Sequence, residues 1–190
     1  MSAVGPRQPA SPGTGSRRAY AGRVISLDVD TVRYPDGTTG EIEIIRHPGA
    51  SAVVPFLSDP TGSDPQLLLL HQYRYAAGGY LYELPAGRLE PGEEPMACAA
   101  RELQEETGCT AAHLEALTTF FTTPGFTDER IHLFMATDLV RGVAATESDE
   151  FIELVTQPLS RCLEMIASGE IRDAKTVLGI LFAAGYRTGA

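Results

Sequence analysis

The chain has 190 residues, of which 43% are hydrophobic and 21% charged, and its formal net charge is −10. This composition suits one globular domain, and no apolar run is long enough to span a membrane. The negative charge disfavours long-range attraction to nucleic acid or to an anionic membrane, although local arginines and bound cations can still recruit an anionic substrate.

The cysteines also exclude some classes of protein. Cys98, Cys109 and Cys162 are odd in number and have no CxxC spacing, so we expect neither a disulfide framework nor a zinc site. We interpret them as small buried side chains. Arg17 and Arg18 have no apolar stretch beside them that would make a secretory signal. Together these features predict a cytoplasmic protein.

The N-terminal part divides into a tail and the start of a folded domain. Residues 1–18 are rich in Pro, Gly and Ser and predict a disordered tail, so the domain is expected to cover residues 19–190. Apolar residues between 24 and 32 predict a strand that ends before the turn at 35–37. Charged and apolar residues then alternate over 41–46, which predicts a strand with one solvated face.

The middle of the chain predicts further strands. Two apolar runs cover residues 52–57 and 67–73, and a loop rich in Pro, Asp and Gly separates them over 58–65. A short strand follows at residues 81–84 and is closed by Pro85.

The second half predicts helices and strands in alternation. A helix over 95–107 is bounded by Pro95 at its first position and by Gly108 just past its end. Further strands are expected at 114–121, 131–138 and 151–155, and further helices at 158–168 and 174–184, the last stopped by Gly185. This order predicts an α/β or α+β layered domain in which a mixed β-sheet lies between helices.

The helix over 95–107 carries an acidic face. Its expected apolar stripe is Met96, Ala99, Ala100, Leu103 and Thr107. Glu102, Glu105 and Glu106 instead lie within one sector of roughly 100°. A solvated acidic surface is one reading, but like charges at these spacings cost roughly 0.2–0.5 kcal/mol per pair, and the last turn of a helix disfavours anions. A bound hard cation such as Mg²⁺ would offset both costs.

The loop before this helix supports the metal reading. Gly87 permits a tight backbone path, and Pro91 and Gly92 mark a second turn. Glu93 precedes the helix and could pair with Arg101, which would hold the loop against the helix; otherwise it is only an acid that favours a helix N-terminus.

The segment from Gly87 to Cys109 resembles the Nudix box, G-x5-E-x7-R-E-U-x-E-E-x-G-U, in which U is a bulky aliphatic residue. The matching residues are Gly87, Glu93, Arg101, Glu102, Leu103, Glu105, Glu106 and Gly108. Only Cys109, at the last U position, departs from the pattern. The resemblance implies a Nudix-like α/β/α sandwich in which Gly87, Glu93 and Arg101 have structural roles.

Residues outside the box resemble the ADP-ribose pyrophosphatase branch of this family. They are Glu83-Leu84-Pro85-Ala86-Gly87, His71-Gln72-Tyr73-Arg74-Tyr75 and Pro124, which lies 15 residues past Cys109. The resemblance implies cleavage of the diphosphate bond of ADP-ribose to AMP and ribose 5-phosphate. It also implies a homodimer in which N-terminal strands exchange between subunits, a role that the strand at 41–46 could fill.

The resemblance implies metal and catalytic roles for the acidic residues. Glu102, Glu106 and the backbone carbonyl of Ala86 would bind Mg²⁺ or Mn²⁺, and Glu105 would be a further ligand, direct or through water. The cations would neutralise the diphosphate and activate water. The base would be a box glutamate or an acid of a late loop, where Glu150 is favoured over Glu147 and Asp149.

Four more residues are implied in substrate binding. Arg74 would bind the diphosphate or the terminal ribose through its planar guanidinium, unless it is a surface charge at a strand end. Arg46 would reach substrate or form a cross-strand ion pair. Arg88 would line the site, and Phe126 would pack against a base or ribose or anchor the core.

Two other functions remain open at this point. Another nucleotide sugar such as GDP-mannose could be the substrate, because the chain has no tryptophan to stack on the base. A non-catalytic ADP-ribose sensor is disfavoured, because the box carboxylates are intact and the chain after the box is too short for a DNA-binding module.

Overall fold

The computed structural model describes residues 15–144 and 151–185. Their contacts divide the chain into two compact units, where we predicted one domain over 19–190. Among the described residues, the first unit covers 15–47 and 123–129, and the second covers 48–122, 130–144 and 151–185.

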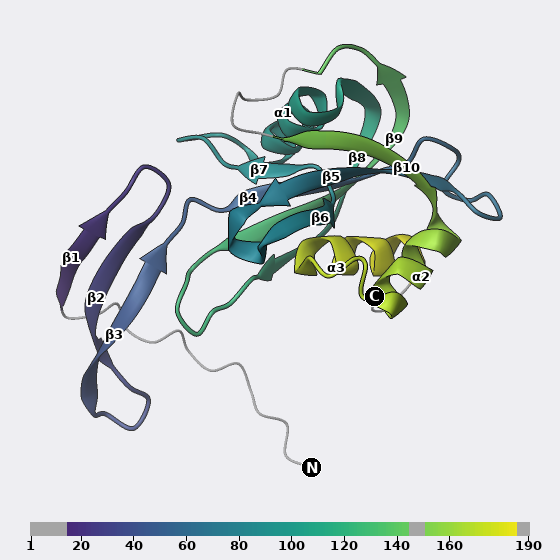
Figure 1. Ribbon diagram of the computed structural model, residues 1–190. Helices are drawn as coiled ribbons and strands as arrows, with labels where there is room; N and C mark the ends of the chain where they lie inside the picture. The colour runs from purple at the N-terminus through teal and green to yellow at the C-terminus, as the bar shows by residue number, and fades with distance from the viewer. Residues whose placement is uncertain (1–14, 145–150, 186–190) are drawn as a thin grey trace. The chain divides into compact units, whose positions relative to one another are not determined.

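The first unit contains a three-stranded antiparallel sheet in the order β1-β2-β3 (Figure 1). Its strands are β1 (Gly15–Ala21), β2 (Ser26–Arg33) and β3 (Thr39–Arg46). Residues 15–18, expected in the tail, pair with β2 instead, which corrects the predicted end of the tail. Residues 123–129 run beside β3, where the backbone N–H of Ile45 donates to the carbonyl of Phe126 at 2.8 Å.

The second unit contains two sheets. The mixed sheet has the order β7-β4-β9-β8, in which β4 and β9 are parallel, and the antiparallel sheet has the order β10-β5-β6. The strands are β4 (Ala50–Pro55), β5 (Gln66–Arg74), β6 (Gly79–Glu83), β7 (Ala86–Arg88), β8 (Cys109–Phe121), β9 (Arg130–Arg141) and β10 (Ile152–Pro158). A 3-10 turn, η1 (Tyr75–Ala77), links β5 to β6.

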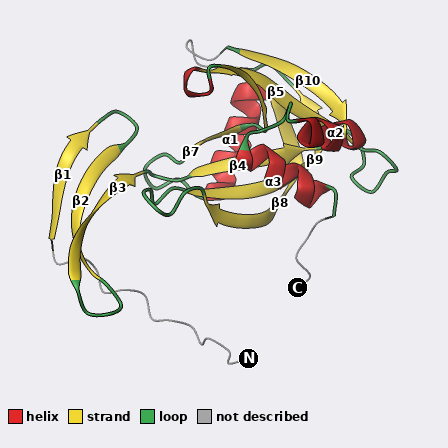
Figure 2. Ribbon diagram, turned by 60° about the horizontal axis from the view of Figure 1, so that its bottom comes forward, coloured by secondary structure: helices red, strands yellow, loops and turns green. Residues whose placement is uncertain are grey.

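Helices cover the strands of the second unit on opposite sides (Figure 2). They are α1 (Pro95–Thr107), α2 (Leu159–Ser168) and α3 (Ala174–Ala183). The alternating side chains of β4 explain the two layers, because Val53 packs in one core cluster with Leu103 of α1, while Val54 packs in the other with Ile180 of α3. The predicted mixed sheet between helices is therefore confirmed.

The observed helix bounds agree with the sequence predictions to within one residue, and Gly185 has the positive φ expected past the end of α3. The apolar stripe of α1 was partly wrong, because Met96 and Ala100 are exposed. The buried residues of this helix are Cys98, Ala99, Glu102, Leu103, Glu106 and Thr107. No helix in the described ranges is both long and apolar enough to cross a bilayer.

Candidate functional site

The box begins on the short strand β7, which is held in place by buried polar contacts. Gly87 of β7 lies opposite Ser51 of β4, and the Ser51 hydroxyl donates to the carbonyl of Pro95, the first residue of α1, at 2.7 Å. The Cys98 thiol lies 3.5 Å from the carbonyls of both Gly87 and Arg88. Burial raises the pKa of Cys98 to about 11, so its sulfur stays protonated and can donate. No motif or spacing in the sequence predicts these roles of Ser51 and Cys98.

Two of the three box carboxylates point toward this strand. Glu102 is 8% exposed and Glu106 is 3% exposed, whereas Glu105 is only half-buried. Glu106 accepts a hydrogen bond at 2.9 Å from the backbone N–H of Ala86. A solvated acidic surface therefore does not describe this face of α1, because two of its glutamates are enclosed.

Gly87 leaves the space in which the Glu102 carboxylate lies. A Cβ added to Gly87 would fall 1.9 Å from Oε1 of Glu102 and 2.0 Å from its Cδ, far inside any real contact. Any other residue at position 87 would therefore displace the Glu102 carboxylate from the place it occupies here.

Arg101 joins the loop to the acidic face of the helix. Its Nε and Nη2 donate to both oxygens of Glu93 at 2.9 and 3.0 Å, which is the ion pair that the sequence predicted. Its Nη1 donates to Glu102 at 2.6 Å and to Glu105 at 2.9 Å. The hydrogen bonds from Arg101 lower the pKa of Glu93 to about 2, so this carboxylate stays ionised at neutral pH.

The oxygen atoms of this face are of the type that binds a divalent cation. Carboxylate oxygens and a backbone carbonyl are the ligands that hard cations such as Mg²⁺ prefer. In residues 15–144 and 151–185, however, no three His, Cys, Asp or Glu side chains already converge as a ligand set. Arg101 bridges Glu102 and Glu105, so it neutralises two of the predicted ligands in this arrangement.

A second charged group lies at the end of β5. Arg74 donates from Nε and Nη2 to the two oxygens of Glu83 at 2.8 and 2.9 Å. In the sequence Glu83 stands out only as part of the motif Glu83-Leu84-Pro85-Ala86-Gly87, which does not predict its pairing with Arg74. A signal for some cationic partner was present, because a lone carboxylate in the short strand Leu81-Tyr82-Glu83-Leu84 must find a cation if it is buried.

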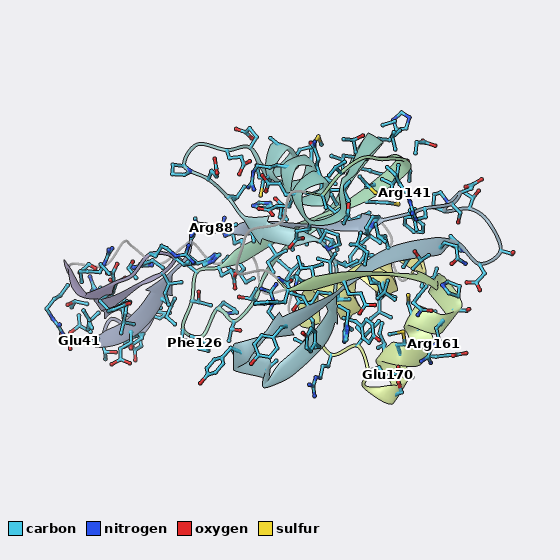
Figure 3. All side chains as sticks on the ribbon, turned by 45° about the horizontal axis from the view of Figure 1, so that its top comes forward. Glu41, Arg88, Phe126, Arg141, Arg161 and Glu170 are labelled. Atoms are coloured by element: carbon cyan, nitrogen blue, oxygen red, sulfur yellow. The ribbon has the colours of Figure 1, made fainter. Side chains whose placement is uncertain are left out.

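The remaining predicted site residues differ in their surroundings. Arg46 belongs to the first unit and donates to Asp28, Asp30 and Asp128 there, which supports the ion-pair reading. Phe126, also in the first unit, is 52% exposed and does not anchor a core. Arg88 exposes its side chain on β7 of the second unit (Figure 3). Glu150, like Glu147 and Asp149, lies outside the described residues.

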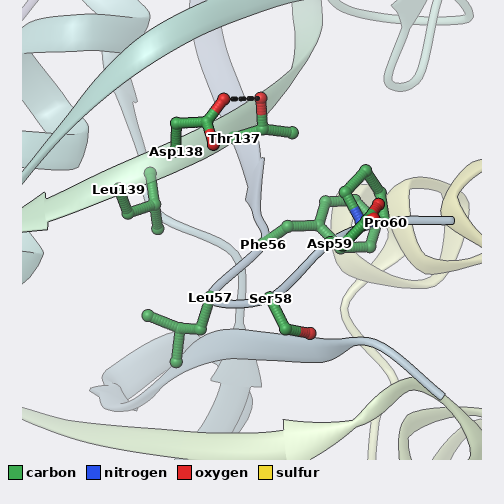
Figure 4. A pocket seen from close by; sticks show the side chains of 8 residues that line it. All are labelled: Phe56, Leu57, Ser58, Asp59, Pro60, Thr137, Asp138 and Leu139. Atoms are coloured by element: carbon green, nitrogen blue, oxygen red, sulfur yellow. Dashed lines mark hydrogen bonds between the residues drawn. The ribbon is translucent and has the colours of Figure 1, made fainter. Parts of the chain in front are cut away.

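A cavity of about 470 Å³ opens between residues 56–60, which follow β4, and residues 137–139 of β9 (Figure 4). Its polar groups include Asp59 and Asp138. The lining includes none of the described residues that the sequence predicts for the site.

The sequence and the fold resemble those of known proteins. The family model described as the NUDIX domain matches residues 47–176. The methanol dehydrogenase activator of Bacillus methanolicus is 39% identical over 169 residues, covering 88% of this chain and 89% of that protein. The ADP-ribose pyrophosphatase of Bacillus subtilis (strain 168) is 39% identical over 165 residues, covering 86% of each.

A crystal structure of an ADP compounds hydrolase has the same fold, with a TM-score of 0.77 over 95% of this chain and 96% of that one at 19% identity. Nudix hydrolases generally use divalent metal ions, in line with the carboxylates of α1. Since the family model covers residues 47–176 and two relatives match over most of their length, the chain belongs to the Nudix family and is a Nudix hydrolase.

Proposed function

We propose that the protein hydrolyses the diphosphate bond of ADP-ribose to AMP and ribose 5-phosphate in the cytoplasm. The observation that carries this proposal is the enclosed pair of Glu102 and Glu106 against the backbone of Ala86 and Gly87. The 39% identity to an ADP-ribose pyrophosphatase supports the substrate.

The divalent cation in this proposal is Mg²⁺, with Mn²⁺ as the alternative. Glu102, Glu106 and the carbonyl of Ala86 would hold it, and Glu105 would add a direct or water-mediated ligand. When bound, it would supply charge neutralisation for the diphosphate and activation of the attacking water.

The chain's own residues position the substrate and the proton acceptor. The Nε and Nη2 of Arg74 both donate to Glu83. Its Nη1 donates no hydrogen bond within the described part of the chain, so it can donate to a phosphate oxygen of the substrate. Arg88, exposed beside the box, is proposed as a second contact to substrate. Glu150 is the proposed base, with Glu105 and Glu106 as the alternatives.

Two residues that the sequence predicts for substrate binding, Arg46 and Phe126, belong to the first unit. Phe126 exposes half of its ring, which leaves it available to a base or ribose. Arg46 already pairs with three aspartates, so we propose that its main role is to hold the first unit together.

The direct test of the function is Glu106→Gln. We expect kcat/KM for ADP-ribose to fall about 100-fold or more, equivalent to roughly 3 kcal/mol of transition-state stabilisation, because the amide is a weaker ligand than the carboxylate. Incubation of the enzyme with a panel of nucleotide sugars that includes GDP-mannose, followed by chromatography of the products, identifies the substrate. The matched control is Glu94→Gln, an exposed acid just before α1, which should leave the rate unchanged. A near wild-type rate in Glu106→Gln would show that Glu106 is not an essential metal ligand.

Removal of metal gives a second test. Treatment with EDTA should abolish turnover, and added Mg²⁺ should restore it and raise the melting temperature, because a ligand that binds only the folded state stabilises it. Glu106→Gln should lose most of this thermal shift. Full turnover after EDTA, or an equal shift in both proteins, would contradict the proposed site.

A further inference from the structure

A chain of alternating charges runs from the end of β5 to the first turn of α3. Arg74 pairs with Glu83, Glu83 pairs with Lys175, and the Nζ of Lys175 also lies 3.0 Å from Asp173. Glu83 and Lys175 are 92 positions apart in the sequence, so only the tertiary fold joins them. No motif or spacing in the sequence points to Lys175.

The centre of this chain is enclosed. The Glu83 side chain is 2% exposed and that of Lys175 is 12% exposed, whereas Arg74 is 42% exposed. A buried carboxylate is costly unless it is paired with cations and hydrogen-bonded. Burial favours the neutral form of Glu83, but Arg74 and Lys175 outweigh it and hold the pKa of Glu83 below its usual range.

The geometry divides the two oxygens of Glu83 between two cations. Oε1 accepts from Arg74 Nε, while Oε2 accepts from both Arg74 Nη2 and Lys175 Nζ. This double pairing fixes the plane of the guanidinium. The edge of Arg74 that carries Nη1 is left for a ligand.

The same turn of α3 also holds the strand that leads into the box. The backbone N–H of Leu84 donates to the Thr176 hydroxyl at 2.9 Å, and Asp173 accepts from the backbone N–H and hydroxyl of Thr176. The start of α3 therefore contacts two consecutive residues, Glu83 and Leu84, just before Pro85 and Ala86.

We infer that Lys175 is a positioning residue for hydrolysis, because it holds the Glu83 carboxylate in the orientation that presents Arg74 to the substrate diphosphate. The inference rests on the proposed function, in which Arg74 binds that diphosphate. Lys175 itself acts through Glu83 and touches no reacting atom.

The competing explanation is that Lys175 only stabilises α3 through Asp173. The two explanations differ in which kinetic constant changes. Loss of stability alone leaves KM of the folded enzyme intact, whereas a misoriented Arg74 weakens substrate binding.

The experiment compares Lys175→Met, which removes the charge at similar length, with Lys175→Arg, which keeps it. We expect Lys175→Met to raise KM about tenfold with kcat within about twofold, and Lys175→Arg to recover most of the loss. In a Glu83→Gln background, Lys175→Met should add little, because the group it orients is gone. Arg161→Met is the matched control, since Arg161 of α2 pairs with Glu164 on the same helix and with Glu170 just past its end, without contacting Glu83.

A second readout needs no turnover. The Nε–H signal of Arg74 in ¹⁵N NMR, assigned through Arg74→Lys, should exchange slowly with water in the wild type and in Lys175→Arg, and several-fold faster in Lys175→Met. If Lys175→Met does not fold, Lys175→Gln replaces it. Unchanged KM and unchanged Nε–H exchange in a folded Lys175 variant would overturn the inference. A wild type that hydrolyses no ADP-ribose would count against the proposed function instead, and the NMR comparison would still decide the role of Lys175.

Discussion

At the scale of single residues, the site depends on a glycine that leaves room for a carboxylate. Gly87 has no Cβ, and the carboxylate of Glu102 occupies the space that one would fill. The carboxylate cannot move away freely, because Arg101 holds it and because little of it is exposed. The position of the Glu102 carboxylate, a proposed metal ligand, thus depends on the backbone at Gly87.

Gly87→Ala should therefore impair activity more than stability. We expect kcat/KM to fall about 100-fold, because displacement of a ligating group by about 1 Å can cost that much. Steady-state kinetics at saturating Mg²⁺ provide the measurement. Gly15→Ala is the control, since its new Cβ would meet only Thr31, at 3.9 Å. Wild-type kinetics in Gly87→Ala would mean that Glu102 does not act from the position seen here.

At the scale of elements, α3 approaches the sheet closely at a glycine. A Cβ on Gly179 would lie 2.4 Å from Cδ1 of Leu84 and 3.0 Å from Cγ2 of Val54, and both of these side chains are fully buried. Glycine is unfavourable inside a helix, so its presence in α3 indicates that packing outweighs helix propensity at this position.

Gly179→Ala tests that balance. Alanine should gain up to about 1 kcal/mol in helix propensity, but overpacking costs about 1–3 kcal/mol, so we expect a net loss of about 1 kcal/mol in the free energy of unfolding. Urea denaturation measures the change. A higher free energy of unfolding in Gly179→Ala would contradict this expectation, because it would mean that Leu84 can move aside for the added methyl group.

The elements also differ in how well the sequence predicted them. Pro95 and Gly108 bound α1 through local chemistry, so its ends were predicted correctly. β1 was missed because residues 15–21 show no apolar alternation, and its strand conformation comes from pairing with β2. β8 begins five residues before the predicted strand, where it pairs with the end of β9.

At the scale of the whole molecule, we propose a homodimer in which the N-terminal strands exchange. β1 is exposed along its full length and forms an edge of its sheet, so it is available to a second chain. Light scattering after size exclusion should give a mass twice the 20.4 kDa of one chain across a range of concentrations. A constant mass of one chain would contradict the proposal.

The sequence by itself determined the acidic face of α1, the pairing of Glu93 with Arg101 and the family. These depend on helical spacing and on residues close together in the chain, which local geometry relates directly. Only the tertiary structure decided that Glu102 and Glu106 are enclosed against β7 and that Lys175 meets Glu83. These contacts join segments brought together by packing, and no periodicity in the sequence encodes which buried charge will face which partner.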